Sequence, residues 1–128
     1  MARPASEQPT NVELQILGVL WDEGPSPVRT IHRHLSSIKQ TNYSTTVKML
    51  SVMLDKGLVR RDESVRPHVY RAAVTRAGAQ KRALKDVVQK LYEGSAKSLV
   101  MQALSTQKAS KEDLAEIRRL IERLEGDQ

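Results

Sequence analysis

Cysteine and phenylalanine are both absent from the 128-residue chain, and aromatic residues make up only 3% of it. Without cysteine the protein has no disulfide, no thiolate metal cluster and no cysteine nucleophile, which fits a reducing compartment. A core with so few aromatic rings must rest on Leu, Ile, Val, Ala and Met, and this favours packed helices over a β-sandwich. At this length we expect one compact unit, or a small domain with an appendage.

A long apolar run is also missing. Residues 1–9 carry two prolines and no signal-peptide core, and no segment approaches the length needed to cross a bilayer. We therefore expect a soluble, cytoplasmic protein that does not insert into a membrane, with residues 1–9 as a disordered arm. There is no glycine-rich phosphate loop, nucleophile elbow or His-Glu-x-x-His motif, so we predict neither an enzyme nor a bound cofactor.

Positive charge is in excess. The formal net charge is +6 and the sequence pI is about 9.8. No acidic residue occurs from Gly24 to Leu54. The basic residues of that stretch are Arg29, Arg33, Lys39 and Lys48. This balance favours a polyanionic partner, although charge alone does not choose between DNA, RNA and anionic lipid.

Start and stop signals predict two short helices before residue 40. Thr10 and Glu13 have the spacing of a capping box, which opens a helix that Gly24-Pro25 ends. Ser26-Pro27 repeats the start signal, with proline at the first helical position. We expect this second helix to run from about Pro27 to Leu35.

A third helix is predicted before Gly57, and its phase is ambiguous. Residues 47, 50 and 54 give one apolar face, for which Ser44 would be the cap. Met49, Leu50 and Met53 together with Thr46 give another, for which Asn42 would be the cap. Both sets have helical spacing, so the residues alone leave the choice open.

Two short strands follow Gly57. Residues 58–61 and 69–71 flank the charged, turn-forming segment 62–67, which is the pattern of a β-hairpin. Three helices followed by a hairpin is the order of a winged helix, in which the third helix enters the DNA major groove. We therefore predict a mainly α fold: a winged helix-turn-helix domain at 10–75, with a small β-hairpin wing.

From about Thr75 the chain is predicted to be helical, with a break at Gly94 and a new cap at Ser110. The apolar residues of this part form stripes that so short a chain cannot bury alone, so we expect residues 76–128 to form a helical dimerisation domain. The residues expected at this interface are Val87, Val88, Leu91, Leu99, Val100, Leu104, Leu114, Ile117, Ile121 and Leu124.

The order of these pieces resembles the penicillinase-repressor family of bacterial transcription regulators (the BlaI/MecI type). The similarity extends from Glu13 through Leu104, with a comparable last helix. It is carried by residues 13–17 with Leu20-Trp21, by 28–31, 43–50 and 56–59, by 62–63 with 69–70, and by 98–104. Each piece is short, and their order and spacing together carry the resemblance.

The resemblance implies a homodimeric repressor that binds a pseudo-palindromic DNA operator, in a β-lactam or other stress response. It also implies that Thr46, Met49, Leu50 and Met53 are the buried face, with Thr46 at a position that is usually aliphatic. The residues then predicted to contact DNA are Asn42, Tyr43, Ser44, Thr45, Val47, Lys48 and Ser51 on the third helix, and Arg66 and His68 in the hairpin loop.

Plainer readings of the same residues stay open. Lys48 is either a DNA contact or a solvated surface lysine. Ser44 and Thr45 either contact DNA or only occupy the first turn of the helix. Arg66 and His68 either reach the DNA backbone or lie in a solvated loop. For the whole protein, the alternatives are a winged helix that binds another protein and a nucleic-acid binder without a preferred site.

Two switches known from relatives lack their motifs here. β-Lactam-responsive relatives are cut by a membrane sensor protease, usually between Asn and Phe, and this chain has Gln102-Ala103 at that position. The altered pair argues against cleavage by that protease, and the plainer reading is that the segment belongs to the dimer core. The cysteine-rich motif of copper-responsive relatives is absent. His32 and His34 are two residues apart on a helix and cannot share one ion, so no metal site is expected.

Overall fold

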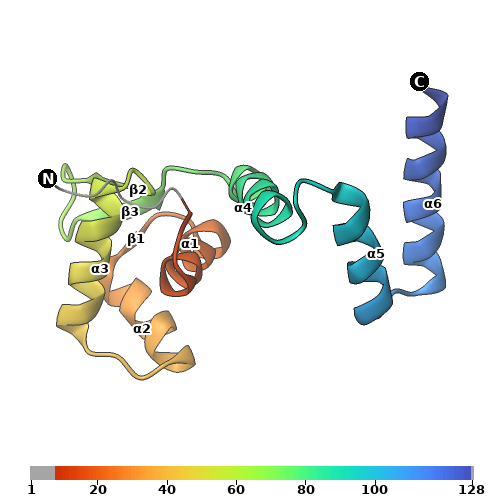
Figure 1. The fold of residues 1–128 in the computed structure, drawn as a ribbon. Helices are drawn as coiled ribbons and strands as arrows, with labels where there is room; N and C mark the ends of the chain where they lie inside the picture. Colours follow the sequence, from red (N-terminus) through yellow and green to blue (C-terminus); the bar gives the residue numbers. More distant parts are fainter. Residues whose placement is uncertain (1–7, 128) are drawn as a thin grey trace, which may run out of the picture. The chain divides into compact units, whose positions relative to one another are not determined.

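The computed structural model describes residues 8–127. Over these residues the chain forms six helices and three short strands (Figure 1). In chain order these are α1 (Asn11–Glu23), β1 (Ser26–Pro27), α2 (Val28–Ile38), α3 (Tyr43–Asp55), β2 (Val59–Asp62), β3 (Val69–Ala72), α4 (Arg76–Leu91), α5 (Ala96–Thr106) and α6 (Lys111–Gly126). The predicted fold class, a mainly α winged helix-turn-helix with a small β wing and a helical C-terminal segment, is confirmed.

The chain divides into two compact units. The first extends through Leu84 and the second begins at Lys85, within α4. The sequence predicted a domain boundary near residue 75, between a winged-helix domain and a dimerisation domain, and that division stays a prediction. Residues 1–7 of the predicted N-terminal arm lie outside the described residues.

Helix α1 begins with the predicted capping box. The Thr10 hydroxyl accepts from the backbone N–H of Glu13 at 3.2 Å, and a Glu13 carboxylate oxygen accepts from the backbone N–H of Thr10 at 2.9 Å. The helix ends at Gly24, whose φ of 84° is in the region that glycine adopts without steric penalty. Start and end are thus set by local hydrogen bonding and backbone freedom.

The start of α2 differs from the prediction. Pro27 is the N-cap residue rather than the first helical residue, and the helix extends to Ile38 rather than Leu35. Ser26 and Pro27 form the short strand β1, which pairs antiparallel with β3, so the sheet has the order β1-β3-β2 and not just a hairpin. Proline can occupy this edge strand because a ladder hydrogen bond from its nitrogen is not required there.

Helix α3 adopts the phase that the family resemblance implied. Asn42 is the N-cap residue, and its side chain accepts from the backbone N–H of Thr45 at 2.9 Å. Thr46, Leu50 and Met53 are fully buried, and Met49 is half-buried. The helix ends before Gly57, which has a φ of 77°.

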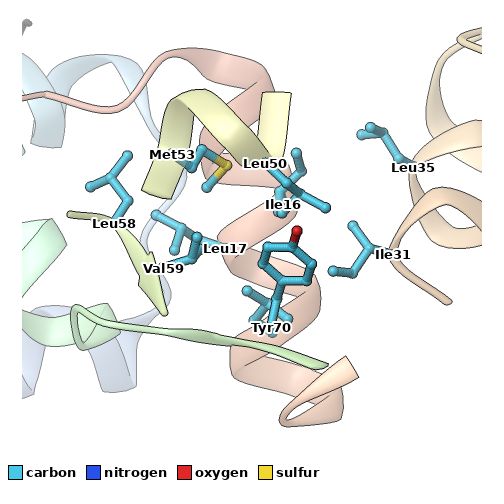
Figure 2. Close-up of a cluster of buried hydrophobic side chains, with 10 residues drawn as sticks. Ile16, Leu17, Ile31, Leu35, Leu50, Met53, Leu58, Val59 and Tyr70 are labelled. Atoms are coloured by element: carbon cyan, nitrogen blue, oxygen red, sulfur yellow. The ribbon is translucent and has the colours of Figure 1, made fainter. Parts of the chain in front are cut away.

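The core of the first unit is aliphatic with one ring. Side chains from α1, α2, α3 and the strands gather in one cluster, in which Tyr70 supplies the aromatic ring (Figure 2). Its buried members are Ile16, Leu17, Leu20, Ile31, Leu35, Leu50, Met53, Leu58, Val59 and Tyr70. Burying this apolar surface fixes the three helices against the sheet.

The beginning of α4 is joined to α1. The indole N–H of Trp21 donates to the backbone oxygen of Val74 at 2.9 Å. The Arg76 guanidinium lies over the Trp21 ring, 5.2 Å from its centroid, and pairs with Asp22 at 2.8 Å. These contacts hold the first turn of α4 to the winged-helix unit.

The second unit consists of the end of α4, α5 and α6. Ser95 caps α5. Ser110 caps α6 as predicted, and together with Asp113 it forms a capping box with both reciprocal hydrogen bonds present. None of residues 85–127, all of which the structure describes, is buried. The helices are therefore well capped, but their apolar side chains lack a core within this unit.

Candidate nucleic-acid interface

The outward face of α3 is polar, short and basic. Ser44, Thr45, Lys48 and Ser51 are exposed, and Val47 is 40% exposed. Their spacing places them opposite the buried Thr46–Leu50–Met53 face. A helix with short side chains and one lysine on its outward face can approach base edges closely, which suits the major groove.

The first turn of α3 shows how its hydroxyl groups are engaged. The Asn42 side-chain oxygen accepts from the Ser44 hydroxyl at 3.0 Å and from the Thr45 hydroxyl at 2.7 Å, in addition to the Thr45 backbone N–H. Both hydroxyl hydrogens are thereby used within the protein. Ser44 and Thr45 keep lone pairs that can accept from base amino groups, but donating to a phosphate would require them to leave Asn42.

A cleft separates the first turns of α2 and α3 from the hairpin loop. Arg29, Thr30 and Tyr43 line one side of it, and Arg66 and His68 line the other. Pro27 provides no side-chain hydrogen bond to cap α2. The first backbone N–H groups of α2 therefore keep their positive partial charge at a cleft that already holds two arginines. This environment suits a phosphate.

Arg29 and Thr30 were not among the predicted DNA contacts. The signal that could have identified them is the acid-free stretch in which they lie, together with the start of a helix at Pro27. Among the described residues neither Arg29 nor Arg66 has an acidic partner, so both guanidinium groups remain available. One cleft thus brings together Tyr43, Arg66 and His68 with two residues from α2, and their contact with DNA stays a prediction.

The arginines of the wing are not equivalent. Arg61 pairs with Glu63 at 2.6 Å and donates to the Tyr70 hydroxyl at 3.5 Å. These hydrogen bonds raise the pKa of Arg61, which stays charged but already has an anionic partner. Asp62 accepts from the Ser64 backbone N–H and hydroxyl, and these bonds lower the pKa of Asp62. Arg66 is consequently the freer cation of the loop.

The apolar residues predicted to mediate dimerisation are exposed or half-buried: Leu91, Val100, Leu104, Leu114, Ile121 and Leu124 are exposed, and Val87, Val88, Leu99 and Ile117 are half-buried. Leu91 is 74% exposed, Leu124 is 54% exposed, and Ile121 is 48% exposed. The end of α5 and the face of α6 border an open groove whose apolar lining includes Leu104, Ile117 and Leu120. Contiguous exposed apolar surface often marks an interaction site, and dimerisation through these residues stays a prediction.

The possible cleavage position lies within a helix. Gln102 and Ala103 lie inside α5, and the Gln102 backbone oxygen accepts from the Thr106 hydroxyl at 2.8 Å. Within residues 8–127, no group of three or more His, Cys, Asp or Glu side chains is placed to hold a metal ion. No helix in the described part of the chain has the length and apolarity needed to span a membrane.

The chain is similar to one protein family in its sequence and to a solved structure in its fold. The family model described as penicillinase repressor matches residues 9–123. Among solved structures the chain is similar to a MarR family protein from Bacillus stearothermophilus, with 22% sequence identity, a TM-score of 0.46, and coverage of 92% of this chain and 74% of that chain. A search of curated proteins gave no match.

Proposed function

Since the chain belongs to the penicillinase-repressor family of transcription regulators, we propose that it is a sequence-specific repressor that binds a pseudo-palindromic operator as a homodimer. In this proposal α3 of each protomer enters one major groove, and the C-terminal units join the protomers and set the half-site spacing. The repressor acts in the cytoplasm by excluding polymerase from a promoter.

The observation that carries the proposal is the distribution of charge. Residues 1–84 contain 13 Lys and Arg against 7 Asp and Glu, whereas residues 85–128 contain 8 of each, so the whole net charge of +6 belongs to the first unit. Between Gly24 and Leu54, which includes α2 and nearly all of α3, acids are absent altogether. Attraction to phosphate is therefore concentrated on the two helices of the helix-turn-helix.

We assign the contacts by side-chain chemistry. Arg29, Tyr43, Arg66 and His68 contact the backbone phosphates beside the cleft. Lys48 and Val47 reach base edges, and the hydroxyl oxygens of Ser44, Thr45 and Ser51 are hydrogen-bond acceptors beside them. Asn42 acts mainly through the cap that organises this turn. Phosphate contacts supply most of the affinity, and the outward face of α3 supplies the sequence preference.

The apolar side chains of the second unit support the proposed dimer. A chain with aliphatic side chains exposed along α4, α5 and α6 gains apolar burial when a second copy covers them. The predicted residues Val87, Val88, Leu99, Val100 and Leu114 contribute to the same surface as Leu91, Leu104, Ile117, Ile121 and Leu124. The winged-helix domains of the two protomers are then linked, so when one of them is bound to the operator the other is held near it at a high effective concentration.

Selection from a randomised duplex pool tests the proposal. The full-length protein is expected to enrich one sequence with two-fold symmetry, and footprinting should protect two half-sites about one helical turn apart. Affinity should fall steeply with salt concentration because bound phosphates release counterions. Binding without any enriched sequence would leave only a general nucleic-acid binder. Absence of salt-dependent duplex binding would point instead to a protein-interaction module.

A further inference from the structure

His32 of α2 contacts α3 at two residues. Its Nδ1 atom lies 2.9 Å from the Thr46 hydroxyl oxygen. Its ring also meets the Tyr43 ring edge to face, with 5.4 Å between the centroids and 76° between the planes. Thr46 lies on the buried face of α3, and Tyr43 lies at its exposed start. One half-buried side chain therefore holds the DNA-facing helix from inside and from its first turn.

The neighbouring hydrogen bonds determine the direction of the His32–Thr46 bond. The Ser36 hydroxyl donates its single hydrogen to the backbone oxygen of His32, so toward the ring Ser36 is an acceptor. Because His32 Nε2 lies 3.3 Å from the Ser36 hydroxyl oxygen, we infer the tautomer that carries its hydrogen on Nε2. Nδ1 is then an acceptor, and the Thr46 hydroxyl donates to it.

The buried position of Thr46 makes this bond necessary. Thr46 is 0% exposed and belongs to the same face as Leu50 and Met53, where an aliphatic side chain would pack without needing a partner. A buried hydroxyl without a hydrogen bond is destabilising. Since a hydrogen bond is directional whereas apolar contact is not, the His32–Thr46 bond restricts the rotation and axial shift of α3 against α2.

We propose that His32 is a positioning residue that sets the orientation of α3 for base recognition, an inference that rests on the proposed function. Contacts to base edges demand an orientation accurate to a fraction of an ångström, whereas attraction to phosphates does not. Loss of His32 therefore reduces discrimination between DNA sequences more than it reduces affinity for DNA in general.

Four variants test this role: His32→Leu, His32→Asn, Thr46→Val and the double variant His32→Leu/Thr46→Val. The probes are a duplex that the wild-type protein selects from a randomised pool and a shuffled duplex of equal length and composition. For His32→Leu we expect affinity for the selected duplex to fall about tenfold, comparable to one net hydrogen bond, while affinity for the shuffled duplex changes less than about twofold.

The remaining variants separate the hydrogen bond from other effects. Asparagine places an amide oxygen near the position of Nδ1, so His32→Asn should restore part of the discrimination. Thr46→Val removes the donor and should behave like His32→Leu. The double variant should be no worse than either single variant, because both remove the same bond. His34→Leu is the matched control, since the half-buried His34 ring makes no hydrogen bond to any residue that the structure describes.

The outcomes distinguish the two proposals. A wild-type protein that selects no sequence contradicts the proposed function itself. If the wild-type protein discriminates and His32→Leu discriminates equally well, the positioning role is wrong. The same holds if His32→Leu weakens both duplexes equally, or if the loss only follows the folded fraction measured by thermal unfolding. His32→Asn and Thr46→Val allow the comparison even where the leucine variant folds poorly.

Discussion

The two units of this molecule are incomplete in opposite ways. The first has a closed aliphatic core and a net charge of +6, whereas residues 85–128 have no net charge. None of residues 85–127 is buried. Hydrophobic burial stabilises a unit on its own, while unbalanced charge favours an oppositely charged partner. The first unit thus lacks only a partner of negative charge. The second unit lacks only a partner surface that covers its apolar side chains.

Each deficit indicates its own kind of partner. A polyanion neutralises the surface formed by α2, α3 and the wing, but it contributes nothing to aliphatic helices. In the proposed homodimer a second copy would bury the aliphatic stripes, and the even balance of acids and bases around them would avoid repulsion between identical chains. The division lets affinity for DNA and association of protomers be altered by separate substitutions, which makes the comparison testable.

The largest effect is expected from the second unit. Replacing Ile117 and Ile121 together with Gln keeps helix propensity and charge but removes two aliphatic side chains, one half-buried and one exposed, from the apolar stripe of α6. We expect the variant to sediment as a monomer at micromolar concentration. Its operator affinity should fall roughly 100-fold or more, because each winged-helix domain then binds its half-site alone, without a linked second domain held nearby.

Glu122→Gln is the control for this variant. Glu122 is exposed on the same helix, next to Ile121 but outside the stripe, so the substitution should leave both sedimentation and DNA affinity unchanged. If the double variant remains a dimer, the α6 stripe is not the interface. If it becomes monomeric and binds the operator as tightly as before, operator affinity does not depend on linking two winged-helix domains.

A smaller effect is expected at the buried ion pair of the first unit. The Glu13 carboxylate lies 2.7 Å from the Lys56 ammonium, with side chains only 3% and 10% exposed. Glu13→Gln leaves the Lys56 charge without its partner, and we expect a loss of about 2–3 kcal/mol in the free energy of unfolding. Asp86→Asn in the second unit breaks the exposed pair with Lys90 and should change it by less than about 0.5 kcal/mol.

The Glu13 pair also predicts a pH dependence. Burial raises the pKa of Glu13, but the hydrogen bonds from Lys56 and Thr10 and the charge of Lys56 outweigh it, so the pKa lies below the ordinary value of 4.5. The stabilisation is therefore complete above pH 4.5 and is lost as the pH falls through the lowered value. Thermal unfolding at fixed protein concentration should show this acid slope, and Glu13→Gln should reduce it.

Lysines from the two units provide the next test. Lys48→Ala on α3 should weaken operator binding about tenfold, because it removes the proposed contact to a base edge. Lys97→Ala on α5 removes the same charge from an exposed position in the second unit and should change affinity less than about twofold. Equal losses for both variants would mean that general charge, and not the face of α3, governs binding.

Local signals predicted much of the fold. The Thr10–Glu13 and Ser110–Asp113 capping boxes were readable because cap hydrogen bonds depend on residues three apart, and Gly24 ended α1 as expected. The phase of α3 was different, since its two apolar faces have equal spacing, and the family resemblance supported the phase that the structure shows. Local patterns therefore located elements better than they oriented them.

Long-range pairs account for what the sequence did not reveal. Strand β1 forms because Ser26 and Pro27 pair with Tyr70 and Val69, more than 40 positions away. From the local sequence alone, Pro27 was predicted as the first residue of the helix. Thr46 seemed anomalous on a buried face, and its partner His32 could be identified only once α2 and α3 were packed together. The cleft residues Arg29 and Thr30 likewise gain their significance from the loop across from them.

The smallest expected effect concerns two glycines of the first unit. Gly18 lies inside α1, and a Cβ atom there would meet no atom within 4 Å, so Gly18→Ala should raise the free energy of unfolding by about 0.5–1 kcal/mol through reduced freedom of the unfolded chain. Gly24→Ala has equal space but a φ of 84°, and it should destabilise by about 1 kcal/mol. Thermal unfolding of both variants separates the two causes. If both variants are more stable than the wild-type protein, backbone strain at Gly24 is negligible. If both are less stable, the packing of α1 at Gly18 does not accept a methyl group.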